Sequence, residues 1–218
     1  MHKTKIDKPL SLFIAVTGFV AQFFCLFQKA FDMINNLVEA IRKNLGYPPL
    51  QKVDPNSQEI KEIWSSPTDE KLAQAAIPSV LTALFKMTRT MDGCNALLAT
   101  DGHADWLSVI FNDRDREVVE KLAQYSGAED QVVERNMEDI ADEAVKLVKE
   151  SVGEKAGPEK VRNYMNGQRH HILVHLPAQL NMGDLLNDEG LDDRTNKMEG
   201  PVSNFMHKIE NKLAGGES

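Results

Sequence analysis

The chain has 218 residues, 42% hydrophobic and 27% charged, which is enough apolar surface for one large or two small domains and excludes wholesale disorder. Its two cysteines, Cys25 and Cys94, are too few for a disulfide-stapled scaffold or a zinc site built mainly from thiolates. A formal net charge of −8 argues against general binding to phosphates, so we do not expect nucleic acid as a partner.

The N-terminal segment differs from the rest of the chain. Residues 2–8 contain three lysines and one aspartate, and residues 10–27 contain no charged side chain. A basic flank before an apolar run is typical of a signal peptide or a membrane anchor. No small-x-small cleavage site follows, so the chain as given predicts a retained single-pass anchor at 10–27, with the lysines on the cytoplasmic side. The alternative is that translation begins at Met33, which makes residues 1–32 a mis-assigned start and the protein cytoplasmic.

From residue 33 onward the apolar residues recur with helical spacing. The first amphipathic helix is expected over 34–45, with Asp32 as its N-cap and Gly46 as its stop. A proline-bearing loop follows, and then a short helix near 57–64.

A longer helix is expected to start at Ser66 and Pro67, where a capping hydroxyl precedes a proline at the first helical position. Pro78 predicts a kink or a split in it, because proline removes a backbone donor. Asp92 and Gly93 predict a turn. One apolar stripe is expected along this helix: Leu72, Ala75, Ala76, Ile77, Leu81, Leu84, Phe85 and Thr88.

Two further helices are expected before the longest one. They are a short helix near 94–99 and a helix over 114–125 that Gly127 closes. Between them lies an apolar cluster of Trp106, Leu107, Ile110 and Phe111.

The longest helix is expected over 130–152, with a salt-bridged solvent face opposite its buried face. The buried face comprises Val133, Met137, Ile140, Ala141, Ala144, Val145 and Val148. Pro158 starts another helix, Pro177 interrupts the next, and Pro201 opens a last one. No segment alternates with period two, so the predicted fold class is all-α.

Two parts of the body share one order of features. Residues 34–87 and 139–186 each run as amphipathic helix, glycine stop, proline-bearing loop, helix, and then Ile-Pro or Leu-Pro. This order predicts a duplicated helical unit around a common core. We therefore expect four parts: a leader over 1–32, a first helical unit over 33–128, a second unit packed on it over 129–186, and an acidic loop with a C-terminal helix over 187–218.

Several segments carry a family resemblance. They are NNLVEAIRKNLG (35–46), AIPSVLTALFKM (76–87), DGCNALLA (92–99), VVEKLAQYSG (118–127) and the tail over 180–213, where Gly-Asp-Leu-Leu precedes an acidic loop. Over roughly residues 33–213 the chain resembles the YidB-like family of bacterial proteins of unknown function. The resemblance implies a multi-helical, bundle-like domain without an assigned enzymatic activity, and it carries over no catalytic residue. It also favours Met33 as the start.

Three histidines are the candidate metal ligands: His170, His171 and His175. On a helix, His171 and His175 would lie one turn apart on the same face, which is ligand spacing for zinc or nickel. A third ligand would have to come from elsewhere, such as Asp184 or Asp188. The alternative, which the apolar residues between His171 and His175 favour, is a surface or partly buried histidine cluster without a metal.

The acidic loop over 188–199 resembles a calcium loop in part. Positions 1, 5, 9 and 12 of an EF-hand frame would be Asp188, Asp192, Asn196 and Glu199. Gly190 stands where a ligand is needed, and Asp193 stands where the sharp turn needs glycine. We therefore expect a solvated acidic loop.

Cys94 and His103 form the one Cys/His pair that lies close in sequence. A nucleophile needs a base within hydrogen-bond reach, and nothing in the sequence fixes that arrangement, so a packed cysteine is expected. The sequence contains no G-x-S-x-G, G-x-G-x-x-G or P-loop motif, which weakens the case for an enzyme.

Three hypotheses of function follow. The first is a non-enzymatic all-α module for protein–protein interaction or scaffolding, tethered through residues 10–27 if the leader is real, whose partner the sequence does not name. The second is a small metal-dependent helical enzyme that uses His170, His171 and His175. The third is a nucleic-acid-binding helical domain, which the net negative charge disfavours. No resident cofactor is expected, and the oligomeric state stays open.

Overall fold

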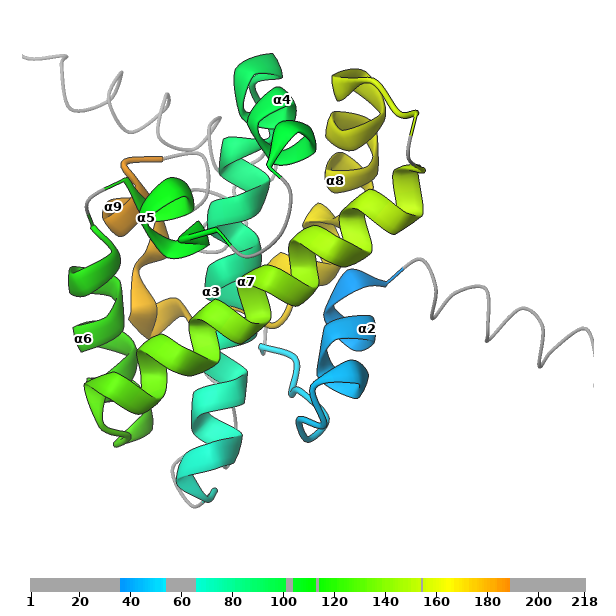
Figure 1. The fold of residues 1–218 in the computed structure, drawn as a ribbon. Helices are drawn as coiled ribbons and strands as arrows, with labels where there is room; N and C mark the ends of the chain where they lie inside the picture. The colour runs from blue at the N-terminus through cyan, green and yellow to red at the C-terminus, as the bar shows by residue number, and fades with distance from the viewer. Residues whose placement is uncertain (1–35, 54–65, 101–103, 113, 154, 189–218) are drawn as a thin grey trace, which may run out of the picture.

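The computed structural model describes residues 36–53, 66–100, 104–112, 114–153 and 155–188. These residues form helices and connecting loops without a strand, which confirms the all-α prediction (Figure 1). The helices are α2 (Leu37–Asn44), α3 (Thr68–Met87), α4 (Met91–Ala99), α5 (Trp106–Phe111), α6 (Asp115–Ser126), α7 (Asp130–Val152), α8 (Pro158–Leu173), the 3-10 turn η2 (Ala178–Leu180) and α9 (Met182–Leu186). The predicted leader helix, the helix near 57–64 and the helix opened by Pro201 lie outside the described residues.

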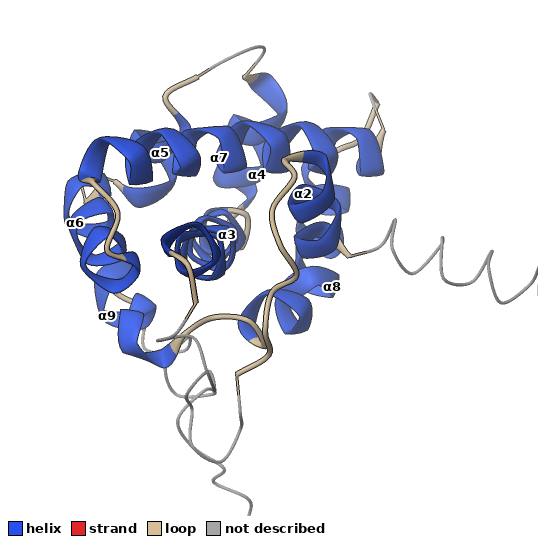
Figure 2. Cartoon of the chain, turned by 90° about the horizontal axis from the view of Figure 1, so that it is seen from below, coloured by secondary structure: helices blue, strands red, loops and turns tan. Residues whose placement is uncertain are grey.

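Helix α3 lies at the centre of the bundle. Figure 2 looks along its axis and shows the other helices arranged around it, and α2, α5, α6, α7, α8 and α9 all contact it. Every residue from Leu72 to Phe85 is buried, so the single stripe expected from the sequence understates the burial. The reason is visible in the composition: no charged side chain occurs between Lys71 and Lys86, and a helix that is apolar on all sides belongs in a core.

The ends of α2 follow capping rules. Its N-cap is Asn36, whose side-chain oxygen accepts a hydrogen bond from the Glu39 backbone N–H at 3.3 Å, so the expectation that Asp32 caps this helix is wrong. Gly46 stops the helix as expected. Its φ of +75° is accessible to glycine, and the following N–H, of Tyr47, donates to the Arg42 carbonyl at 2.8 Å.

Three local expectations around α3 and α4 are corrected. The N-cap of α3 is Pro67 and no side chain caps it, so Ser66 does not supply a capping hydroxyl. The helix then runs unbroken through Pro78. The chain turns before residues 92–93, because the Thr90 hydroxyl accepts a hydrogen bond from the Gly93 N–H at 3.0 Å and places Gly93 in the first turn of α4.

The rest of the described chain agrees closely with the expected pattern. Gly127 ends α6 with φ +77°, Pro158 begins α8, and the buried face of α7 consists of the seven residues predicted for it. The predicted apolar cluster lies in α5, and its four residues, Trp106, Leu107, Ile110 and Phe111, are buried. Buried residues from α2 to α9 form one hydrophobic cluster, to which both expected units contribute. Duplication of the two units stays a prediction.

Candidate functional site

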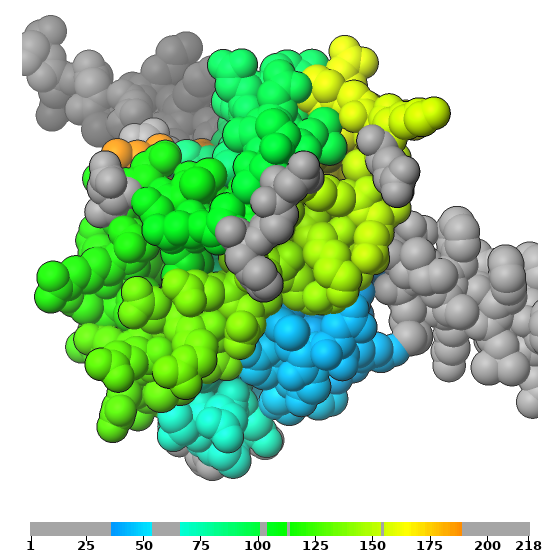
Figure 3. Space-filling model, viewed as in Figure 1, coloured from blue at the N-terminus to red at the C-terminus, as the bar shows by residue number. Residues whose placement is uncertain are grey.

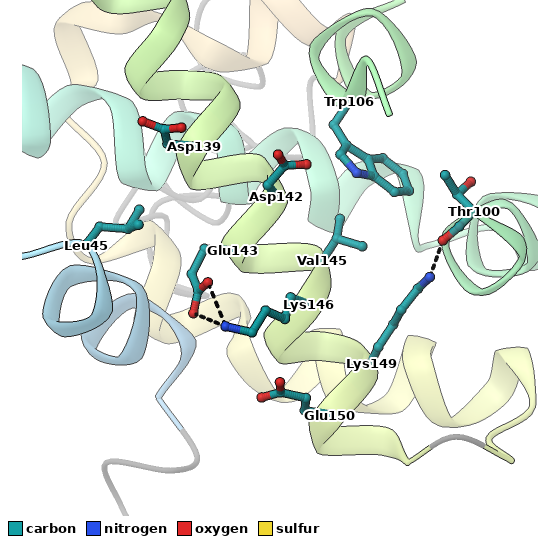
Figure 4. Close-up of a pocket in the computed structure, with 10 residues that line it drawn as sticks. All are labelled: Leu45, Thr100, Trp106, Asp139, Asp142, Glu143, Val145, Lys146, Lys149 and Glu150. Carbon is teal, nitrogen blue, oxygen red and sulfur yellow. Dashed lines mark hydrogen bonds and ion pairs between the residues drawn. The ribbon is translucent and has the colours of Figure 1, made fainter. Parts of the chain in front are cut away.

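A groove of about 520 Å³ lies along the outer side of α7 (Figure 4). We call it the α7 groove. Its lining residues are Leu45, Thr100, Trp106, Asp139, Asp142, Glu143, Val145, Lys146, Lys149 and Glu150. In the space-filling view this part of α7 lies between α2 and α4 on the face turned toward the reader (Figure 3). Residues 139–150 extend roughly 17 Å along the helix axis at about 1.5 Å per residue, which is the length of a three-turn helix.

The apolar part of the groove comes from three elements. Trp106 is the first residue of α5, and Asp105 positions that helix by accepting a hydrogen bond from the Ser108 N–H at 3.1 Å. Val145 projects from the edge of the buried face of α7. Half-buried Leu45 follows the last residue of α2, where Gly46 turns the chain. The groove therefore depends on the tertiary packing of α2 and α5 against α7.

Polar contacts hold the side chains along the groove (Figure 4). The Lys146 Nζ lies 3.1 Å from a carboxylate oxygen of Glu143, and the Asn44 side-chain amide donates to the other oxygen at 2.7 Å. The Lys149 ammonium donates to the Thr100 carbonyl. These contacts tie α7 to the ends of α2 and α4, and they direct both groove lysines toward acceptors of the protein itself.

The N-terminal half of α7 carries a row of carboxylates. Glu134, Glu138 and Asp142 are spaced four residues apart, so they lie along one side of the helix, and we call them the carboxylate row. Desolvation raises the pKa of Glu138 above its ordinary value, and the negative charges of four neighbouring carboxylates raise it further. These neighbours are Glu134, Asp105, Asp139 and Asp142. Like charges at this spacing destabilise a helix by about 0.2–0.5 kcal/mol per pair. Of the row, Asp142 lines the groove together with Asp139, whereas Glu134 and Glu138 lie beside the groove on α7.

The segment after α2 is fixed to α7 beside the groove. The Tyr47 hydroxyl and the Asn136 side-chain oxygen lie 2.6 Å apart, in hydrogen-bond contact. Burial raises the pKa of Tyr47 to about 12, and the charge of Asp139 acts in the same direction. The phenol therefore stays protonated at neutral pH and serves as a permanent donor.

The three candidate metal ligands are not arranged as the sequence suggested. His170 is exposed and His171 is half-buried, and their ring centroids lie 6.0 Å apart. Helix α8 ends at Leu173, so His171 and His175 do not share one helix. Within the described ranges no group of three or more His, Cys, Asp or Glu side chains could hold a metal ion, and the metal site stays a prediction.

His175 takes part in a buried hydrogen-bond network. Its ring Nδ1 lies 2.9 Å from the Gln51 carbonyl, while its own carbonyl accepts from the Gln74 side-chain amide at 2.8 Å. Gln74 also accepts from the Gln51 N–H at 2.8 Å. Burial lowers the pKa of His175, outweighing the Gln51 carbonyl, which raises it. The contacts indicate a structural role: they join the segment after α2 to α3 and to the end of α8.

The suggested third ligands have other contacts. The Asp188 carboxylate forms an ion pair with Arg89. The backbone carbonyl of Asp184 accepts from Arg114, and its side chain is exposed. The remaining positions of the acidic loop over 188–199 lie outside the described residues.

Cys94 is packed, as expected. Its side chain is fully buried on α4, and its sulfur lies 3.0 Å from the Thr88 carbonyl. Burial raises the pKa of the thiol, so less thiolate is present than at an exposed cysteine. His103, the base considered for it, lies outside the described residues.

Comparisons with protein-family models, with curated proteins and with solved structures each found no match. The resemblance to the YidB-like family therefore stays an expectation. Within the described ranges, no helix combines the length and the apolar character needed to cross a membrane. The anchor expected over 10–27 lies outside those ranges.

Sequence reasoning did not identify the α7 groove. It assigned the charges of α7 to a salt-bridged solvent face; an ion pair between Glu143 and Lys146 does lie there, and the carboxylate row runs along the same helix. The available signal was the uneven charge of α7: seven acids are spread over the helix, but two of its three basic residues are Lys146 and Lys149, near its end. The apolar contributions from Leu45 and Trp106 depend on tertiary packing and have no local signal.

Proposed function

We propose that this protein is a non-enzymatic protein–protein interaction or scaffolding module that binds a helical segment of a partner in the α7 groove. The observation that carries the proposal is a groove open at the surface, whose apolar lining comes from half-buried Leu45 and from the exposed edges of the largely buried Trp106 and Val145. All-helical modules bind amphipathic helices in such grooves, with apolar anchors spaced by three or four residues. The length of the groove suits a segment of about three turns.

A designed peptide tests this function without a known partner. The probe is a helical peptide of about 12 residues, with leucines at i, i+3, i+4 and i+7 and glutamine on its polar face. Binding to the full chain is measured by fluorescence anisotropy, and the contact site by amide chemical shifts. We expect the shifts to cluster on residues 139–150 and at Trp106.

Two matched variants distinguish binding in the groove from non-specific hydrophobic binding. Leu45→Ser removes an apolar side chain of the groove, whereas Val132→Ser removes an exposed valine of α7 that does not line it. We expect Leu45→Ser to weaken binding about tenfold, corresponding to the burial of part of a leucine side chain, and Val132→Ser to leave it unchanged. An absence of peptide binding, or equal losses in the two variants, would contradict the proposal.

The N-terminal leader bears on where such a module acts. We propose that, if the chain begins at Met1, residues 10–27 tether it to a membrane and the groove binds partners at that surface. A start at Met33 would instead give a cytoplasmic, YidB-like module. N-terminal sequencing and membrane partition of the protein from its own host separate these two cases.

A further inference from the structure

The acidic side chains of α7 give the groove two chemically different ends. Near its N-terminal end are the carboxylate row and Asp139, and Asp105 approaches from the start of α5. Near the C-terminal end, Lys146 and Lys149 contact Glu143 and the Thr100 carbonyl. The groove therefore combines an apolar centre with a negatively charged border at one end.

The negative charges beside the groove repel one another around Glu138. The four charges that raise the pKa of this side chain are all carboxylates, and three of them come from α7 itself. Like charges at a spacing of four residues repel, and a cation placed beside them removes that repulsion while gaining attraction of its own. A polar or acidic segment in the same position would leave the repulsion in place or increase it.

We propose that the segment that binds the α7 groove is a basic amphipathic helix, whose apolar side chains contact Leu45 and the exposed edges of Trp106 and Val145, and whose lysines or arginines lie against Asp139 and Asp142. This inference rests on the proposed function and names the chemistry of its partner. Charge complementarity selects this occupant, because the cations of such a helix meet the acidic border while its leucines fill the apolar centre.

Three peptides with the same leucine stripe test the inference on the full chain. Their polar faces carry lysine, glutamine or glutamate, and their affinities are measured by anisotropy at about 0.02 M and about 0.5 M salt, where the screening length differs several-fold. Two or three exposed ion pairs predict that the lysine peptide binds about tenfold more tightly than the glutamine peptide at low salt. We expect that advantage to shrink several-fold at high salt, and the glutamate peptide to bind most weakly.

Because the whole chain carries a charge of −8, a matched pair of double variants locates the attraction. Asp139→Asn with Asp142→Asn neutralises two carboxylates that line the groove. Glu70→Gln with Glu117→Gln neutralises two exposed carboxylates on α3 and α6 that do not line it. The double variant at the groove should lose most of the preference for the lysine peptide and should bind the glutamine peptide as tightly as before. The control double variant should bind both peptides as the wild type does.

The outcomes separate this inference from the proposed function. Equal affinity of the lysine and glutamine peptides overturns the basic partner while the groove remains a docking site. Equal effects of the two double variants also overturn it, because the attraction is then a property of the net charge. If none of the three peptides binds, the proposed function itself is contradicted, and the inference about a basic partner is contradicted with it.

Discussion

Replacing Gly93 by alanine tests the packing of α4 against the end of α3. A Cβ at this position would lie 2.0 Å from the Met87 carbonyl oxygen and 2.8 Å from its carbonyl carbon. Real Cβ atoms essentially never come closer than 3.0 Å to another heavy atom, and here both neighbours are backbone, so one helix end has to move by about 1 Å. That movement also disturbs the hydrogen bond from the Gly93 N–H to Thr90.

The magnitude follows from opposing terms. Overpacking of this kind typically costs about 1–3 kcal/mol, and loss of an N-cap bond costs about 1 kcal/mol. The better helix propensity of alanine returns up to about 1 kcal/mol. The last two terms roughly cancel, so we expect Gly93→Ala to lower the free energy of unfolding by about 1–3 kcal/mol.

Urea unfolding followed by far-UV circular dichroism measures this change, with Gly167→Ala as the matched control. Gly167 is an exposed residue of α8, and nothing lies within 4 Å of an added Cβ there. Alanine at that position should stabilise the protein by about 0.5–1 kcal/mol. If the two variants are equally stable, the close approach of Gly93 to Met87 does not exist and the reasoning is refuted.

Three further predictions concern buried polar groups. Gln74→Leu removes the partner of the Gln51 N–H and of the His175 carbonyl, and should lower the free energy of unfolding by about 2–3 kcal/mol in the same urea assay. An unchanged midpoint would contradict the network. Because burial lowers the pKa of His175 in the folded chain, the unfolded chain binds a proton at this side chain more tightly. The contribution of His175 to stability should therefore be complete above about pH 6.5 and should be lost as the pH falls through the folded pKa. The urea midpoint at about pH 7 and about pH 5 should therefore shift less in His175→Asn than in the wild type, and equal shifts would argue against this contribution. In a Cys25→Ser background, buried Cys94 should react with a disulfide reagent at least about tenfold more slowly in the native state than in denaturant. The absorbance of the released thiol measures both rates, and equal rates would show that Cys94 is accessible.

Local periodicity and capping chemistry predicted much of the fold. The buried face of α7 was predictable residue by residue because its apolar positions repeat every three to four residues against a charged background. The turn at residues 92–93 was mispredicted because glycine suggested a break. Instead, the Thr90 side chain caps a helix that begins at Met91, three residues before the expected start at 94. Pro78 was expected to kink or split α3; the helix is not split at this residue, whereas the kink stays a prediction.

The candidate site was less accessible to sequence reasoning. The spacing of His171 and His175 has meaning only if the helix continues to residue 175, and α8 ends at Leu173. The groove brings together residues from α2, α4, α5 and α7, and this proximity arises from packing around α3. Only the uneven distribution of charge along α7 was visible in advance.

The central position of α3 has a consequence for synthesis of the protein on the ribosome. The buried stretch of α3 ends at Phe85, whereas α8, which covers part of it, is complete only about 90 residues later, at Leu173. At a synthesis rate of roughly 5–20 residues per second, about 4–18 s pass between the synthesis of Phe85 and that of Leu173. Helices α6 and α7 are synthesised within that interval. The nascent chain therefore passes through a period in which this apolar helix lacks most of its native neighbours, and during that period it is a natural client for a chaperone.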